Sequence, residues 1–131
     1  MEISLTPGLS RELSLEVKEP QTAHAYGSGL LKVYATPAMI AFMEKAALKA
    51  VAEHLPQGYS TVGTHVNIKH VKATPMGMKV WAKATLTEVE GKKLTFETEA
   101  RDEEGIIGMG VHKRYIINES QFMQMFSGKD L

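Results

Sequence analysis

Two ionisable side chains stand where the hydrophobic pattern of this sequence calls for apolar ones. Glu44 lies in a largely apolar segment without glycine or proline, and the residues three and four positions away from it are apolar. His70 lies in an alternating segment, in phase with Val66 and Ile68. A carboxylate and an imidazole that face one partly dry site are common in catalytic centres, but such pairs also occur as structural hydrogen bonds. We therefore treat Glu44 and His70 as a candidate acid–base pair.

The segment that carries Glu44 is predicted to be one long, mostly buried helix. Thr36 has a hydroxyl suited to the N-cap, and Pro37 suits the first helical position. The pattern continues to Leu55, and Gln57-Gly58 supplies a stop. Its frankly polar residues are spaced by four and form a narrow solvent stripe: Lys45, Lys49 and Glu53. Glu44 lies about 100° away from Lys45 around the helix axis, which predicts a buried carboxylate.

The next segment, Thr61 to Val71, alternates in the manner of a β-strand. Its even positions from Val62 to His70 are predicted to form the core face, and its odd positions the outer face. His70 would then point towards the helix that carries Glu44. His65, on the opposite face, would be partly exposed.

The other segments predict a sheet around this helix. Alternating apolar residues favour further strands at Leu9–Val17, Met78–Thr87, Leu94–Arg101 and Ile106–Ile117, with a short terminal helix over Glu119–Phe126. The order is a strand, the long helix, and then four strands in a meander. This order favours an α+β fold in one domain over residues 1–131, with a five-stranded antiparallel sheet curled around one long helix. Open sheet edges need cover, so we expect pairing with a second copy.

Composition narrows the classes of function. The 131 residues contain 15 Lys and Arg and 15 Asp and Glu, so no basic excess favours nucleic acid or an anionic membrane. The absence of cysteine excludes disulfides, thiolate metal sites and a cysteine nucleophile. The histidine spacings match no metal motif, and Gly27–Gly29 lacks the lysine of a phosphate loop. We expect a cytoplasmic protein with no metal, no cofactor and neither a nucleic-acid nor a membrane partner.

Four stretches of the chain resemble the hotdog-fold thioesterases of the fluoroacetyl-CoA thioesterase type. They are A-T-P-A-M-I-A-F-M-E from Ala35, V-G-T-H-V-N-I-K-H-V-K-A-T-P-M-G from Val62, L-T-E-V-E-G-K-K-L-T-F-E-T-E-A-R-D from Leu86 and G-V-H-K-R-Y-I-I-N from Gly110. The resemblance covers about residues 34–118 and keeps the spacing of the family's catalytic threonine, glutamate and histidine. It implies the catalytic set Thr36, Glu44 and His70.

The resemblance also implies a reaction and an assembly. An acyl-CoA thioester would be hydrolysed at the interface of a homodimer, alone or within a tetramer, with coenzyme A as part of the substrate. Glu44 would attack the thioester carbonyl or activate a water molecule, and His70 would protonate the leaving thiolate. Thr36 would hydrogen-bond Glu44 or the substrate.

Two more residues are implied to bind substrate. Gly63 would lie at the acyl group, where its missing side chain lets the backbone approach the carbonyl. Arg114 matches a family position near the substrate, although a lone strand arginine is equally well explained as a solvated surface charge. Members that act on fluoroacetyl-CoA have a longer, aromatic segment before the helix. The corresponding segment here, Gly27–Val33, has no Phe, so we expect a broader or different preference among short acyl groups.

Two other functions stay open. A hotdog dehydratase or hydratase also uses a histidine and a helix acid, but it normally places the histidine in a His-Phe-Pro-type loop before the helix. This chain has Tyr34-Ala35-Thr36-Pro37 at that place. A non-catalytic acyl-CoA-binding module would keep the same fold and would not need Glu44 to release the ligand.

Overall fold

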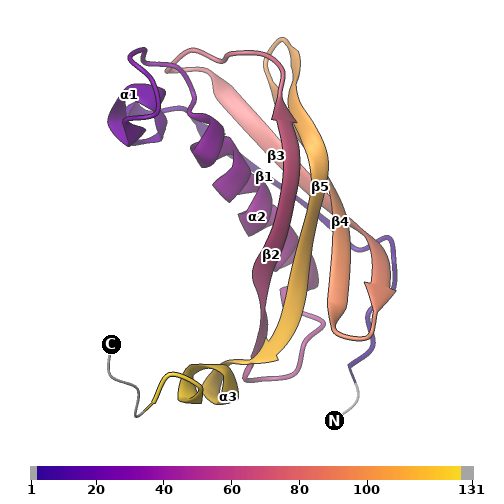
Figure 1. The fold of residues 1–131 in the computed structure, drawn as a ribbon. Coiled ribbons are helices and arrows are strands. Elements are labelled where there is room, and N and C mark those ends of the chain that lie inside the picture. The colour runs from indigo at the N-terminus through magenta and orange to yellow at the C-terminus, as the bar shows by residue number, and fades with distance from the viewer. Residues whose placement is uncertain (1–2, 128–131) are drawn as a thin grey trace.

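One long helix lies in the concave side of a curved antiparallel sheet (Figure 1). The computed structural model describes residues 3–127, so the single domain predicted over residues 1–131 extends beyond the described part at both ends. The central helix is α2 (Thr36–Ala52). The strands are β1 (Ser10–Glu16), β2 (Tyr59–His70), β3 (Lys79–Glu90), β4 (Lys93–Asp102) and β5 (Gly105–Asn118). The short helices are η1 (Glu19–Gln21), α1 (Ala23–Tyr26) and α3 (Glu119–Gln124).

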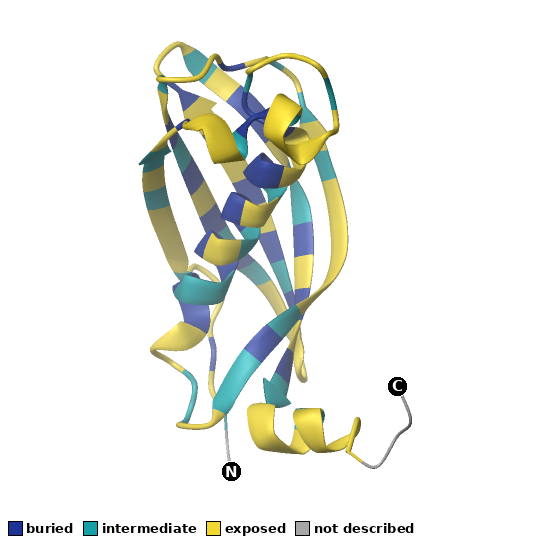
Figure 2. Ribbon diagram, turned by 90° about the vertical axis from the view of Figure 1, so that its left-hand side faces the viewer, coloured by how far each residue is buried: buried dark blue, intermediate teal, exposed yellow. Residues whose placement is uncertain are grey.

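The core lies between α2 and the sheet. Figure 2 shows buried and exposed residues alternating along the strands beneath the helix. The helix buries one face, composed of Ala38, Met39, Phe42, Met43, Ala46, Ala47, Ala50 and Val51. The alternating residues of β3 and β4 face it, as the sequence predicts: Val80, Ala82, Ala84, Leu86, Leu94, Phe96 and Ala100 are all buried. Alanine on both surfaces lets the helix approach the sheet closely, which removes both apolar surfaces from water.

The strand order differs from the predicted four-strand meander. The sheet runs β1-β3-β4-β5-β2, so only β3, β4 and β5 form a meander. Tight turns join these three, with Gly91 and Gly105 at positive φ. The connection from β2 to β3, residues 71–78, is too long for a tight hairpin and crosses the end of the sheet. As a result β2 pairs only with β5, and it forms an edge of the sheet.

The prediction that Thr36 caps α2 is wrong. Ala35 occupies the N-cap with extended backbone and makes no side-chain capping bond, and Thr36 is the first helical residue. Helix α2 also ends at Ala52, three residues before Leu55. The predicted terminal helix is confirmed, because the Asn118 side chain accepts a hydrogen bond from the Gln121 backbone at the start of α3.

A β-bulge changes the face on which the residues of β2 lie. The pairing with β5 shifts between Gly63 and His65, so Thr64 is the extra residue. Before the bulge, the odd positions Thr61 and Gly63 face the helix; after it, the even positions up to His70 do so. The sequence analysis placed the even positions on the core face along the whole strand. This prediction is wrong for the part before the bulge. The bulge places Gly63 and His70 on one face.

Two glycines of β5, Gly108 and Gly110, let neighbouring elements come close. A Cβ built on Gly108 would lie 2.6 Å from the Met39 side chain of α2. A Cβ on Gly110 would collide with the backbone oxygen of Asn67 in β2. These positions therefore tolerate no side chain without a movement of the helix side chain or of the strand backbone.

Candidate active site

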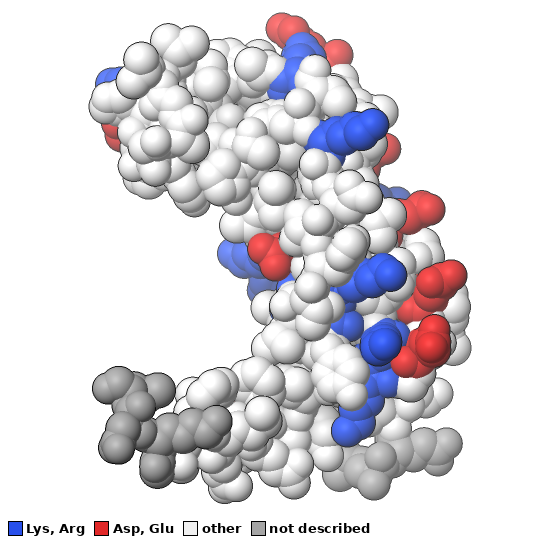
Figure 3. All heavy atoms as spheres, viewed as in Figure 1, with Lys and Arg blue, Asp and Glu red and all other residues white. Residues whose placement is uncertain are grey.

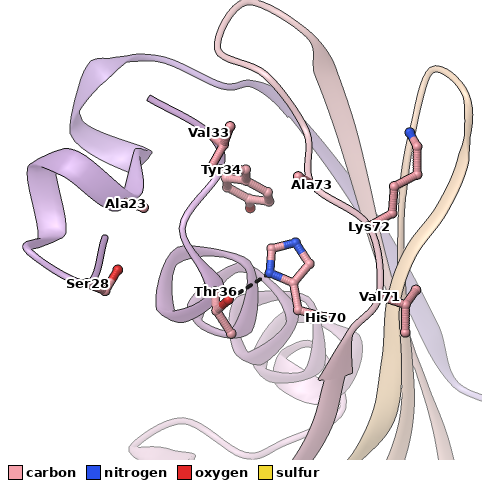
Figure 4. Close-up of a pocket in the computed structure, with 9 residues that line it drawn as sticks. All are labelled: Ala23, Ser28, Val33, Tyr34, Thr36, His70, Val71, Lys72 and Ala73. Atoms are coloured by element: carbon pink, nitrogen blue, oxygen red, sulfur yellow. Dashed lines mark hydrogen bonds between the residues drawn. The ribbon is translucent and has the colours of Figure 1, made fainter. Parts of the chain in front are cut away.

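Thr36 and His70 meet at the N-terminal end of α2. Their side chains, from the first turn of the helix and the last residue of β2, are joined by a hydrogen bond of 2.7 Å between Oγ1 and Nδ1 (Figure 4). They border an open pocket of about 460 Å³. Its lining comes from α1, the segment between α1 and α2, the first residue of α2, and the end of β2 with the residues after it: Ala23, Ser28, Val33, Tyr34, Thr36, His70, Val71, Lys72 and Ala73. The pocket is large enough for a small acyl group.

The imidazole of His70 is held as a neutral base with one nitrogen free. Burial lowers its pKa, and the nearby backbone of Lys72 opposes this only in part. Nε2 of His70 is buried and has no hydrogen-bond partner among residues 3–127, and the same is true of the Tyr34 hydroxyl. Tyr34 is 2% exposed, and burial raises the pKa of its phenol, so the hydroxyl stays protonated. The pocket therefore contains polar atoms suited to a hydrogen-bonding ligand.

The segment after His70 is anchored by a buried carboxylate. Asp102 accepts hydrogen bonds from the Lys72 ammonium at 2.9 Å, the Thr74 hydroxyl at 2.8 Å and the Glu104 backbone at 2.8 Å. Burial raises the pKa of Asp102, but these hydrogen bonds outweigh it and lower the pKa overall. This anchor fixes the chain at the end of β2 and so holds His70 in place.

Glu44 lies two turns further along α2, beside the bulge of β2. A Cβ built on Gly63 would lie 2.7 Å from the Oε2 atom of Glu44, so the carboxylate occupies the space that a side chain would fill. The Glu44 side chain is 36% exposed, so the carboxylate is half-buried and not buried as predicted. Figure 3 shows that this face is hollowed between the α1 and α3 ends, with acidic and basic side chains meeting in the hollow.

Two buried side chains of β5 stand behind the carboxylate. Arg114 Nη1 and His112 Nε2 each lie 3.8 Å from Oε2 of Glu44. Arg114 is 7% exposed and donates to Thr61, through Nε to the hydroxyl at 2.7 Å and through Nη2 to the backbone oxygen at 2.8 Å. The alternative that Arg114 is a solvated surface charge is therefore wrong. The site therefore has a buried guanidinium on the inner side of the Glu44 carboxylate.

Within one protomer, Glu44 lies far from the hydrogen-bonded pair of Thr36 and His70. Because a helix rises about 1.5 Å per residue, Glu44 lies about 12 Å beyond Thr36 along the axis. Among residues 3–127 no hydrogen bond or ion pair joins Glu44 to His70 or to Thr36. His70 does face the helix, as expected, but at its first turn rather than at Glu44.

Comparison with known proteins identifies the family. Residues 17–120 match the model of the FlK family, described as fluoroacetyl-CoA-specific thioesterase. The chain belongs to the FlK family. A fluoroacetyl-CoA thioesterase from Streptantibioticus cattleyicolor is 37% identical over 91 residues, which are 70% of this chain and 66% of that protein, slightly less than two thirds of its length. Family membership confirms the resemblance, and the description of the family, a thioesterase, agrees with the expected enzyme class, thioester hydrolase.

Solved structures agree with this assignment. The fluoroacetyl-CoA thioesterase FlK superposes with a TM-score of 0.90 at 29% identity, over 98% of this chain and 99% of that one. A hypothetical protein from Thermus thermophilus, described as a thioesterase superfamily member, has a TM-score of 0.85 at 27% identity, over 94% and 91% of the two chains. A hot-dog-like protein from Thermanaerovibrio acidaminovorans, 22% identical, matches in fold with a TM-score of 0.81 over 94% of each chain. The expected hotdog fold is confirmed.

One residue of this FlK-family site was missed from the sequence. His112 entered the sequence analysis only as one of the histidines whose spacings match no metal motif, yet it is fully buried beside Glu44. Its spacing of two from Arg114 places both on one strand face, a signal that the glycines of β5 obscured. Among the described residues no cluster of His, Asp or Glu could hold a metal ion. No helix within residues 3–127 is long and apolar enough to cross a membrane.

Proposed function

We propose that this protein hydrolyses short-chain acyl-CoA thioesters to the free acid and coenzyme A. The observation that carries the proposal is the Glu44 carboxylate, accessible on one side, backed by the buried Arg114 on the other, and facing the side-chain-free Gly63. A thioester carbonyl can approach the backbone at such a glycine. Glu44 would attack this carbonyl, or take a proton from a water molecule that attacks it.

His70 and Thr36 would serve the leaving group. If the Thr36 hydroxyl donates to Nδ1, the ring proton of the neutral His70 is on Nε2, the atom that has no partner in the described part of the chain. This N–H would donate a hydrogen bond to the departing CoA sulfur and stabilise the thiolate as the carbon–sulfur bond breaks. The proton that converts the thiolate to the thiol comes from the water molecule that is consumed in hydrolysis. Thr36 is in this account a positioning group that fixes the imidazole tautomer.

We further propose that one active site is built from two protomers. The proposal is supported by the long edge strand β2, whose Val66 is 43% exposed, and by the separation of Glu44 from His70 within one chain. Two copies of β2 that pair antiparallel around a two-fold axis between Val66 and Asn67 would bring Gly63 beside the partner subunit's His70. The Glu44 carboxylate next to Gly63 would then reach the partner's imidazole.

Mixing two inactive variants tests this assembly. Subunits carrying Glu44→Gln and subunits carrying His70→Ala should each be inactive alone, but their mixed dimer contains one site with both wild-type groups. After unfolding and refolding at equal amounts, half of the dimers are mixed, so we expect about a quarter of the wild-type thiol release. Recovery of no activity, with mixed dimers demonstrated by differently tagged chains, would show that each site is formed within one chain.

Thiol release from a panel of acyl-CoAs tests the function itself. Because the chain has no cysteine, a thiol reagent reports only the coenzyme A set free. The panel includes acetyl-, propionyl-, butyryl- and fluoroacetyl-CoA, the last because of the substrate named for the relatives. We expect turnover of several short acyl groups, since Gly27–Val33 has no Phe. Binding without release would favour the acyl-CoA-binding module instead. The cytoplasmic location stays a prediction from the sequence.

A further inference from the structure

We propose that His112 is a positioning residue that holds the Arg114 guanidinium against Glu44 through one fixed, neutral tautomer of its ring. The inference rests on the proposed function, because it assigns His112 a role in the site that contains Glu44. Its basis is the set of hydrogen bonds that His112 makes with Arg114 of β5 and with the bulge of β2.

The hydrogen bonds around His112 determine which nitrogen carries the proton. Nδ1 lies 2.8 Å from the backbone oxygen of His65, which can only accept, so Nδ1 must be the protonated nitrogen. Nε2 lies 3.0 Å from Nη1 of Arg114, which can only donate, so Nε2 must hold a lone pair. Both bonds are satisfied by the neutral ring with its proton on Nδ1.

The other tautomer and the imidazolium would each break the hydrogen bond between His112 and Arg114. A proton on Nε2 would point at the N–H of Arg114, and two donors cannot bond to one another. The imidazolium would in addition place a second positive charge beside the guanidinium in a dry interior. Burial lowers the pKa of His112, and Arg114 lowers it further, in the direction that keeps the ring neutral.

The environment of the ring leaves it little freedom. His112 is fully buried, and the Phe96 ring of β4 stacks on it with a centroid distance of 6.4 Å. The charged and titratable groups around it are Arg114 on its own strand, Glu44 on α2 and His65 on β2. The hydrogen bond to the His65 carbonyl and the charge of Glu44 raise the pKa of His112, but burial and Arg114 outweigh them and the pKa is lowered overall. The Glu44 carboxylate is itself 3.8 Å from Arg114. The Arg114 guanidinium therefore competes with the His112 ring for the Glu44 carboxylate.

The β-bulge of β2 supplies the carbonyl that accepts the hydrogen bond from His112. His65 directly follows the extra residue of β2, where the regular pairing with β5 is interrupted, and its carbonyl accepts from a side chain. The same bulge brings Gly63 to the helix-facing side, next to Glu44. One irregularity of the backbone thus provides both the space in front of the carboxylate and the anchor for the groups behind it.

Two substitutions of His112 separate positioning from packing. His112→Gln keeps an amide N–H for the His65 carbonyl and an amide oxygen for Arg114, whereas His112→Phe fills the space and offers neither. We expect the Phe variant to lose about 10- to 100-fold in kcat, and the Gln variant to recover to within a few-fold of the wild type. His54→Gln, at an exposed position after α2, serves as the matched control with unchanged kcat. A folded Phe variant with wild-type kcat would overturn the proposal.

Nitrogen NMR of the wild-type ring gives a readout that needs neither a variant nor turnover. With 15N-labelled histidine, we expect His112 to show a protonated Nδ1 and an unprotonated Nε2 at neutral pH. A signal from the Nε2–H tautomer or from the imidazolium would overturn the proposal, even if the Phe variant fails to fold. If the wild type releases no thiol from any acyl-CoA, the proposed function fails, while the ring nitrogens still decide whether His112 holds Arg114.

Discussion

Replacement of Glu44 by glutamine is expected to lower CoA release by about 10³-fold or more. Glutamine has nearly the same shape as glutamate, but its amide can neither take a proton from water nor form an acyl intermediate. Loss of a general base alone removes about 10²- to 10⁴-fold, and loss of a nucleophile removes the route entirely. Initial rates with the best acyl-CoA of the panel measure the effect.

A matched substitution on the same helix controls for charge. Glu53 caps the C-terminal end of α2 at an exposed position, so Glu53→Gln removes the same charge outside the site and should leave the rate unchanged. The melting temperature and the elution volume of the Glu44→Gln variant should stay at the wild-type values, because its side chain is 36% exposed. A folded Glu44→Gln variant with full turnover would contradict the role of this carboxylate.

Gly63→Ala is expected to reduce turnover by about 10²-fold while leaving the fold intact. The new Cβ would lie 2.7 Å from Oε2 of Glu44, the movable end of a flexible side chain, and 3.2 Å from Cε1 of the His112 ring. The carboxylate would make the larger shift, the ring would give by a few tenths of an ångström, and no strand backbone stands in the way. A displacement of a reacting group by about 1 Å can cost about 10²-fold in rate. The Gly63 backbone is not at positive φ, so alanine introduces no backbone strain.

Comparison with another glycine distinguishes this effect from general disruption. Gly110→Ala would drive its Cβ into the backbone of β2, at Asn67 and Ile68, and there the strand itself must move. We therefore expect this variant to lose stability as well as activity, whereas Gly63→Ala should lose activity alone. Denaturant unfolding beside thiol-release kinetics separates the two results. Wild-type kcat in Gly63→Ala would show that the space at this glycine is not needed.

The local pattern of the sequence is enough to find the elements and the unusual residues. Apolar residues at a spacing of two or of 3.6 predict the strands and the helix, because each element must bury one face. Glu44 and His70 stand out for the same reason, since a charged or titratable group in such a pattern needs a specific explanation. The spacing of Thr36, Glu44 and His70 further indicated the family, which the comparisons confirm.

The tertiary structure alone decides how these residues are grouped. The Thr36 hydroxyl can bond the first turn of its own helix or a distant side chain, and only the position of β2 provides His70. The bulge at Gly63 depends on the pairing with β5, so a period of two cannot reveal it in advance. The sequence by itself thus determined which elements form and which residues are out of place. The partners of those residues were decided by strand order and register, because hydrogen bonds form between groups that only the folded sheet brings together.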